Sequence, residues 1–145
     1  MTSQKDDRSS LTDTPVSTKL KLASLWTALM FLYIYADYFR LMTPGKLEKM
    51  MELKTPMGPT TPELLIIFSS ILIVPALMIF LSVFLKPLFN KWLNITIALL
   101  YAAISILIIV SGMGDAWQTF FVLFNGIELL VLGIILYQAW TWPRN

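Results

Sequence analysis

The sequence contains no cysteine and no histidine. Without cysteine the chain has no disulfide, no thiolate nucleophile and no thiolate metal site. Without histidine it lacks the commonest metal ligand, the commonest general base and an imidazole that titrates near neutral pH. Histidine-ligated haem and every Ser-His triad are therefore excluded, and we expect neither a metal site nor a cofactor.

Charge is also scarce. Charged residues make up 14% of the chain, against about 25% in an average soluble protein. Hydrophobic residues make up 57% of the 145 residues, and the net charge is only +2. So small a charge gives no reason to expect nucleic acid as a partner, and the composition points to the lipid bilayer instead.

Four apolar runs are long enough to cross a bilayer as helices, which takes about 20 residues. They cover about 22–42, 63–85, 91–111 and 116–140. None of them alternates as a β-strand would. The first is too long for the apolar part of a signal peptide, so we expect it to be retained. The sequence predicts an all-α polytopic membrane protein, an antiparallel four-helix bundle forming one domain over residues 22–142.

Outside the spans the sequence is polar. Residues 1–21 predict a disordered cytoplasmic tail. The loop 43–62 predicts a short helix on the outer membrane surface, with Thr43 as its N-cap and Pro44 at its first position. The other two connections are short, and Asn90 and Asp115 are the residues expected to cap the helices that follow.

Basic residues predict the orientation of the bundle. With four spans, seven of the eleven lysines and arginines fall on the face that carries the termini. They are Lys5, Arg8, Lys19, Lys21, Lys86, Lys91 and Arg144. The positive-inside rule then places both termini in the cytoplasm of a protein of the inner or plasma membrane.

Glu128 is the most informative residue because it carries an ionisable group near the centre of the last apolar run. A carboxylate at that depth costs roughly 3 kcal/mol on insertion scales. Such a group is expected to be protonated, paired or directed into a cavity. Gln118, Phe121 and Asn125 lie on the same stripe at helical spacing.

Polar residues of the other spans complete a predicted cup that opens outward above Glu128. Tyr33, Asp37 and Arg40 share one face of the first span, and Tyr101 lies at a depth that allows a hydrogen bond with Glu128. Pro75, in the second span, frees a carbonyl one turn earlier. The candidate ligand-binding residues are Glu128, Asp37, Asn125, Tyr101, Gln118, Tyr33 and Arg40.

Simpler interpretations exist for most of these residues. Asp37 and Arg40 are three positions apart and would form a local ion pair at the interface. Asn94, Tyr101 and Asn125 would form interhelical hydrogen bonds worth about 1 kcal/mol each. Glu128 is the residue for which a purely structural role is hardest to argue.

Short motifs in a fixed order carry a resemblance to a known family. They are Leu25-Trp26, Tyr35-Ala36-Asp37, Leu41-Met42-Thr43-Pro44-Gly45, Phe80-Leu81-Ser82, Asn90-Lys91-Trp92-Leu93-Asn94-Ile95, Ile127-Glu128 and Ala139-Trp140-Thr141-Trp142-Pro143. In this order they resemble DUF6326, an uncharacterised family of small four-span prokaryotic membrane proteins. Lys91 stands where arginine is expected, which keeps the basic character. The resemblance implies the fold and draws attention to Asp37 and Glu128, but it implies no activity.

Three functions are compatible with the sequence. The first is proton-linked binding or transport of a cation or small molecule in the outward-facing polar pocket. The second is a structural or accessory membrane subunit, whose polar stripes join it to itself as a homo-oligomer or to another protein. The third is a lipid-modifying enzyme with Asp37 and Glu128 as acid and base and Tyr101 assisting, but no catalytic set is recognisable and we favour a non-enzymatic role.

Overall fold

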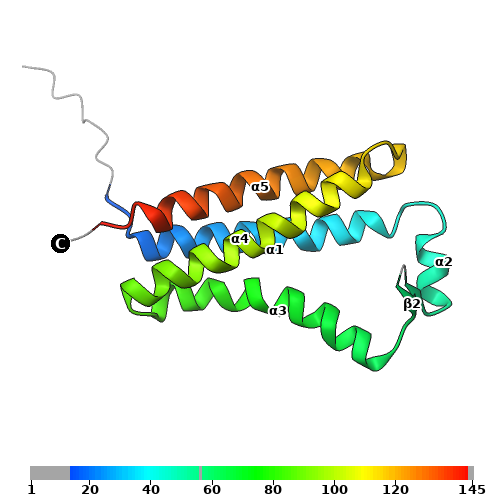
Figure 1. The fold of residues 1–145 in the computed structure, drawn as a ribbon, viewed down its shortest axis with the longest axis horizontal. Coiled ribbons are helices and arrows are strands. Elements are labelled where there is room, and N and C mark those ends of the chain that lie inside the picture. Colours follow the sequence, from blue (N-terminus) through cyan, green and yellow to red (C-terminus); the bar gives the residue numbers. More distant parts are fainter. Residues whose placement is uncertain (1–13, 56, 144–145) are drawn as a thin grey trace, which may run out of the picture.

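The chain forms a bundle of four long helices with a small cap at one end. The computed structural model describes residues 14–55 and 57–143, so Lys5, Arg8 and Arg144 lie outside the described residues. The long helices are α1 (Thr18–Arg40), α3 (Pro62–Phe84), α4 (Pro87–Gly112) and α5 (Thr119–Trp140). A 3₁₀ turn, η1 (Ala116–Gln118), precedes α5. The predicted all-α, antiparallel four-helix bundle is confirmed (Figure 1).

All four long helices are long and apolar enough to cross a membrane, counting η1 with α5. Their surfaces are rich in exposed large hydrophobic side chains, as expected where the surrounding medium is lipid. These features indicate a multi-pass membrane protein. The two ends of the described chain lie at one end of the bundle, and the loop between α1 and α3 lies at the other (Figure 1).

The first helix begins earlier than the sequence predicted. Ser17 caps α1 by accepting a hydrogen bond from the backbone N–H of Leu20, so Lys19 and Lys21 belong to the helix and not to a disordered tail. Lys19 donates to the carbonyl of Val83, at the end of α3. Lysine is well suited to this position because carbonyls at a helix end lack partners within their own helix.

Two predicted caps are wrong and one is confirmed. The short helix α2 (Lys46–Met51) begins after Gly45, whose φ of 71° favours glycine, while the Thr43 hydroxyl donates to the carbonyl of Arg40. Thr43 thus completes the end of α1 and does not start α2. Asn90 lies inside α4, which begins at Pro87. Asp115 does cap η1, by accepting from Trp117 N.

Between α2 and α3 the chain forms a short hairpin. Strands β1 (Lys54–Thr55) and β2 (Gly58–Pro59) pair antiparallel. Thr61 then caps α3 by accepting from the N–H of Leu64, and Pro62 follows at the first position of the helix. Together α2 and the hairpin cover one end of the bundle (Figure 1).

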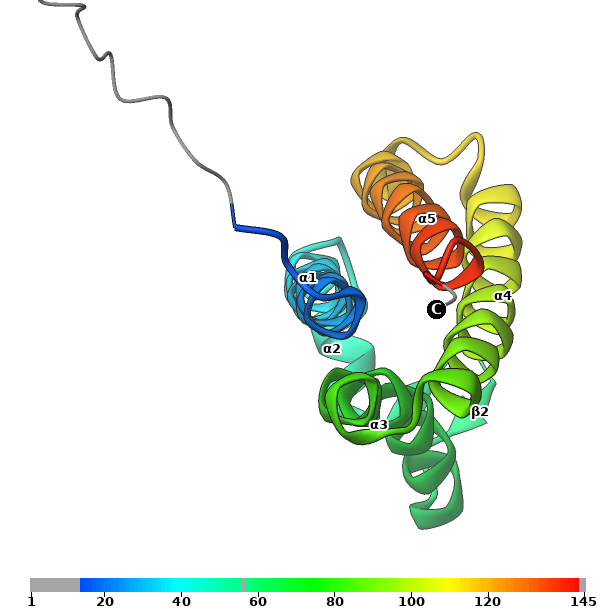
Figure 2. The same ribbon diagram turned by 90° about the vertical axis from the view of Figure 1, so that its left-hand side faces the viewer.

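The four helices do not pack equally. Helix α4 lies along α5, and α1 contacts both α3 and α5. Helices α3 and α4 approach each other near their connection and separate towards the α2 end, as both views show (Figures 1 and 2). The buried hydrophobic residues gather towards the end that carries the termini, around Trp26, Met78 and Leu132.

A polar network joins three helices within this core. The indole N–H of Trp26 donates to Asn94 Oδ1 at 2.7 Å, and the Asn94 amide donates to Asn90 Oδ1 at the same distance. The Asn90 amide in turn donates to the carbonyl of Ser82, near the end of α3. Asn90 and Asn94 are fully buried. These side chains hold α1, α3 and α4 together, so the interpretation of Asn94 as an interhelical link is the correct one.

Pro75 and Tyr101 form a second link between α3 and α4. Proline has no N–H, so the carbonyl of Ile71, four residues before Pro75, loses its partner within the helix. The hydroxyl of Tyr101 donates to this carbonyl. A side chain of the neighbouring helix thereby supplies the hydrogen bond that the proline removes, as membrane helices with internal proline require.

Tyr101→Phe is therefore expected to lower the free energy of unfolding by about 1–2 kcal/mol, because it leaves the Ile71 carbonyl of a membrane-spanning helix without a hydrogen-bond partner. In a Pro75→Ala background the cost should shrink, since the new N–H of residue 75 can bond to Ile71. Tyr33→Phe, whose hydroxyl has no partner among the described residues, is the matched control. Unfolding titrations of the four combinations in detergent measure the coupling, and equal costs in both backgrounds would contradict this assignment.

Candidate functional site

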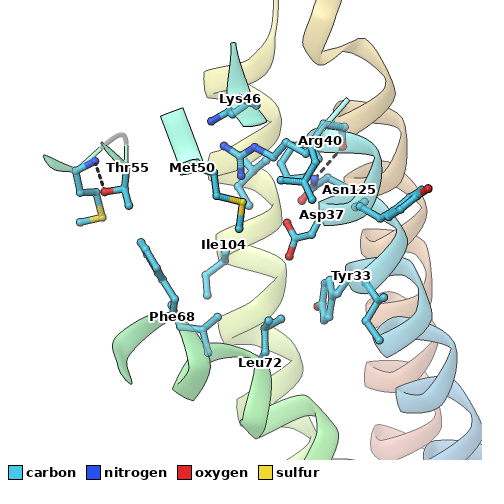
Figure 3. Close-up of a pocket in the computed structure, with 18 of the residues that line it drawn as sticks. Tyr33, Asp37, Arg40, Lys46, Met50, Thr55, Phe68, Leu72, Ile104 and Asn125 are labelled. Atoms are coloured by element: carbon cyan, nitrogen blue, oxygen red, sulfur yellow. Dashed lines mark hydrogen bonds between the residues drawn. The ribbon is translucent and has the colours of Figure 1, made fainter. Parts of the chain in front are cut away.

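A cavity of about 1320 Å³ occupies the end of the bundle that α2 and the hairpin cover. It lies between the second half of α1, the first half of α3, the second half of α4 and the first half of α5. Figure 3 shows its lining, with Lys46 and Arg40 at one end and Tyr33 and Leu72 deeper in. Drug-sized ligand pockets have volumes of about 300–1000 Å³, so this cavity is large for a chain of 145 residues.

Six of the seven predicted ligand-binding residues line this cavity. They are Tyr33, Asp37, Arg40, Tyr101, Asn125 and Glu128. The seventh, Gln118, lines a smaller neighbouring pocket of about 180 Å³ that also includes Arg40 and Asp115. Gln118 immediately precedes α5, about two helical turns before Asn125, and lies outside the main cavity.

Glu128 and Asn125 are deeply buried polar residues of the cavity lining. The side chains are 3% and 1% exposed. Glu128 Oε2 accepts from the hydroxyl of Ser105 across a long 3.3 Å. The Asn125 amide donates to the carbonyl of Phe121, one turn back in its own helix, but its Oδ1 has no hydrogen-bond partner among the described residues. A buried acceptor of this kind costs about 1–3 kcal/mol while it has no donor.

Tyr33 is a third residue of the cavity with an unsatisfied polar group. Its hydroxyl is buried and has no hydrogen-bond partner in the described part of the chain. Its ring lies 6.2 Å from that of Tyr101. The predicted hydrogen bond between Tyr101 and Glu128 is absent from the described structure, because the Tyr101 hydroxyl is committed to Ile71. Tyr101 therefore contributes its aromatic ring to the cavity lining, whereas Tyr33 contributes a hydroxyl without a partner among the described residues.

Asp37 and Arg40 do not pair with each other. The guanidinium of Arg40 lies 4.8 Å from the centre of the Phe121 ring, a cation–π arrangement. Within residues 14–55 and 57–143 the one salt bridge joins Lys54 to Glu52. The ion pair considered from the sequence is therefore wrong, and the Asp37 carboxylate faces the cavity without a cationic partner in the described structure (Figure 3).

Positive charge gathers at the α2 end of the cavity, next to Asp37 and Asn125 (Figure 3). Arg40 is joined there by Lys46 and Lys49 from α2 and by Lys54 from β1. Partial burial, followed by the positive charges of Arg40 and Lys49, lowers the pKa of the Lys46 ammonium. We call Arg40, Lys46, Lys49 and Lys54 the basic rim, and Asp37, Asn125 and Glu128 with Tyr33 the acceptor floor.

The lysines of the rim and Ser105 also line the cavity, although they are not among the seven predicted ligand-binding residues. Lys46 and Lys49 are three residues apart on the predicted surface helix and so share its polar face, but the sequence does not show that this face lies over a cavity. Ser105 lies one turn after Tyr101 on the same stripe of α4. That spacing was the available signal for a hydroxyl facing Glu128.

Comparison with known proteins places the chain in a family. The sequence model described as "Family of unknown function (DUF6326)" matches residues 15–145. The chain belongs to this family. No curated protein and no solved structure matches it. The match covers every long helix of the bundle and the whole cavity lining, so the DUF6326 resemblance seen in the sequence motifs is confirmed, and the prokaryotic origin it implied stays a prediction.

Proposed function

We propose that this chain is a cell-membrane protein, with both termini in the cytoplasm, whose outward-opening cavity binds a small amphiphilic molecule or cation with proton linkage through Glu128. The observation that carries the proposal is the acceptor floor. Asn125 Oδ1 has no described donor, and Glu128 has only the long contact from Ser105. A ligand that brings N–H or O–H groups supplies the donors that the described chain does not provide.

Energetics favour a ligand over a purely structural role for this floor. Polar groups inside a membrane protein are normally satisfied by neighbouring helices. The Trp26, Asn90 and Asn94 network follows that rule, with short hydrogen bonds. Glu128 and Asn125 depart from it in the same molecule, next to a large cavity. This contrast is expected of a binding site, where donors are contributed by the ligand.

Dodecylammonium, a single-chain amphiphile with three N–H donors, is the simplest probe. The purified protein in a maltoside detergent is expected to bind it, and Glu128→Gln should weaken binding by roughly 10- to 100-fold, since a charge-assisted hydrogen bond contributes about 1.5–3 kcal/mol. Glu48→Gln, on the exposed surface of α2, is the matched control and should leave affinity unchanged. Equal affinity of wild type and Glu128→Gln would refute the proposal.

The orientation is tested through the absence of cysteine, since any introduced thiol is unique. Met51→Cys, 78% exposed at the α2 end, is expected to react with a membrane-impermeant maleimide on intact cells. Leu88→Cys, 73% exposed at the opposite end, should react only after the membrane is opened. The reverse pattern would place the cavity on the cytoplasmic side.

A structural or accessory subunit is the second candidate. The observation that favours it is the separation of α3 and α4 at the α2 end (Figure 2). Phe68 and Leu72 of α3 are partly exposed there, so a helix of a partner or of a second copy would find an apolar surface. Cross-linking in native membranes followed by mass measurement distinguishes the two candidates. A stoichiometric partner lost on detergent dilution, together with no binding of amphiphiles, would favour the accessory role.

A further inference from the structure

The cavity holds two kinds of charge in neighbouring parts of its lining, with the cationic groups toward α2. The basic rim holds four cationic side chains, and the acceptor floor holds the Asp37 and Glu128 carboxyl groups with the unpartnered Asn125 Oδ1. A simple cation arriving from water meets the positive rim first, and a simple anion that passes the rim meets the carboxyl groups. The arrangement is complementary to a molecule that carries both charges, its ammonium at the floor and its anionic group at the rim.

One wall of the cavity is apolar. Phe68 and Leu72 of α3 and Ile104 and Ile108 of α4 all line it, and Figure 3 shows the first three on this side of the cavity. Phe68 and Leu72 are 36% and 39% exposed, so this wall of the cavity reaches the outer, lipid-facing surface of the bundle. A hydrocarbon tail can leave the cavity here while its polar head stays between floor and rim.

We propose that the ligand is a zwitterionic amphiphile of the aminophospholipid type, with a primary ammonium and a phosphate in its head and its tail lying between α3 and α4. This inference rests on the proposed function and specifies its ligand. The phosphate meets Arg40, Lys46 and Lys49, and arginine and lysine both bind phosphate oxygens well. The ammonium reaches Asp37, Asn125 and Glu128, which accept its N–H donors.

The requirement for N–H groups makes the proposal specific. Ethanolamine lipids carry an ammonium with three donors, whereas the trimethylammonium of choline lipids has none. A floor that needs donors for Asn125 Oδ1 should therefore discriminate between two heads with the same net charge. General affinity for detergent-like molecules would produce no such difference.

Binding of three probes to the purified protein in maltoside micelles, counted by native mass spectrometry, tests the head group. Lysophosphatidylethanolamine should bind about tenfold or more tightly than lysophosphatidylcholine, the difference expected for one charge-assisted hydrogen bond. The double variant Lys46→Gln/Lys49→Gln should reduce lysophosphatidylethanolamine binding about tenfold and leave dodecylammonium binding unreduced. Lys86→Gln, at the opposite end of the bundle, is the matched control.

The outcomes separate this inference from the proposed function. Glu128-dependent binding of dodecylammonium, with no preference for ethanolamine over choline and no effect of the lysine variant, would overturn the inference alone. Loss of any Glu128-dependent binding would overturn both. A preference for ethanolamine that depends on Lys46 and Lys49 supports both.

The tail position is tested separately with a lysophosphatidylethanolamine that carries a diazirine on its acyl chain. Photolysis is expected to label Phe68, Leu72, Ile104 or Ile108, with the labelled residue located by fragmentation of each peptide, and an excess of unlabelled lysophosphatidylethanolamine should abolish the labelling. Labelling confined to lipid-facing residues such as Ile66 and Leu107, which are 67% and 70% exposed, would contradict the lateral placement of the tail.

Discussion

Asn94→Leu is expected to lower the free energy of unfolding by about 2–3 kcal/mol, since interhelical hydrogen bonds in membranes are worth about 1 kcal/mol each and their loss leaves buried partners unpaired. Asn94 accepts from Trp26 at 2.7 Å and from Ser82 at 3.4 Å, and its amide donates to Asn90. Leucine has a similar volume but no polar atoms. The Trp26 N–H and the Asn90 side chain would therefore be left without these partners inside the bundle.

Unfolding of the purified protein by titration with a denaturing detergent measures this cost. Ser82→Ala is the matched control, because it removes only the long 3.4 Å contact and should change stability by less than about 0.5 kcal/mol. If Asn94→Leu is as stable as the wild type, the network contributes little to the stability of the bundle, despite its short hydrogen bonds.

Glu128→Leu is expected to have the opposite effect on stability and to eliminate ligand binding. A carboxyl group at mid-membrane costs roughly 3 kcal/mol on insertion scales, and the single long bond from Ser105 offsets little of this. We expect the variant to be more stable than the wild type by about 2 kcal/mol. A residue that reduces stability and whose replacement removes binding fits the trade-off expected at functional sites.

The same unfolding titration shows whether Glu128→Leu raises or lowers the free energy of unfolding. Glu128→Gln keeps the shape and separates the loss of charge from the gain of apolar surface, so its stability should lie between those of the wild type and Glu128→Leu. If Glu128→Leu proves as destabilising as Asn94→Leu, then Glu128 is a structural residue like Asn94. The accessory role would then be the better account of the chain.

The four spans were predictable because the bilayer constrains sequence so strongly. A run of about twenty consecutive apolar residues is typical of a membrane-spanning helix and rare in water-soluble domains. The helix starts were harder. Asp115 caps the helix that follows it. Asn90 does not, because it lies one turn inside α4 and its side chain donates a hydrogen bond to the carbonyl of Ser82 in the neighbouring helix. From the sequence alone the two uses of asparagine look the same.

The sequence predicted most of the residues that line the candidate site, but not the hydrogen bonds that they form. The helical spacing of polar residues predicted that Asp37, Asn125 and Glu128 share one pocket, and all three line the cavity. It could not show that Tyr101 serves the carbonyl that Pro75 frees, because this requires the relative depth of two helices to within a residue. The role of Lys46 at the rim depends on how the loop folds back over the bundle, which pattern analysis does not reveal.

Infrared difference spectroscopy of the protein in lipid, wild type against Glu128→Gln over a range of pH, tests the central claim most directly. A Glu128 that borders a cavity reached by water should give a carboxyl band that is missing in Glu128→Gln and that appears and disappears reversibly with pH. Asp37→Asn identifies the contribution of the second carboxyl group. A Glu128 band that stays constant across the whole pH range would show a sealed polar core and would contradict the binding function proposed for the cavity.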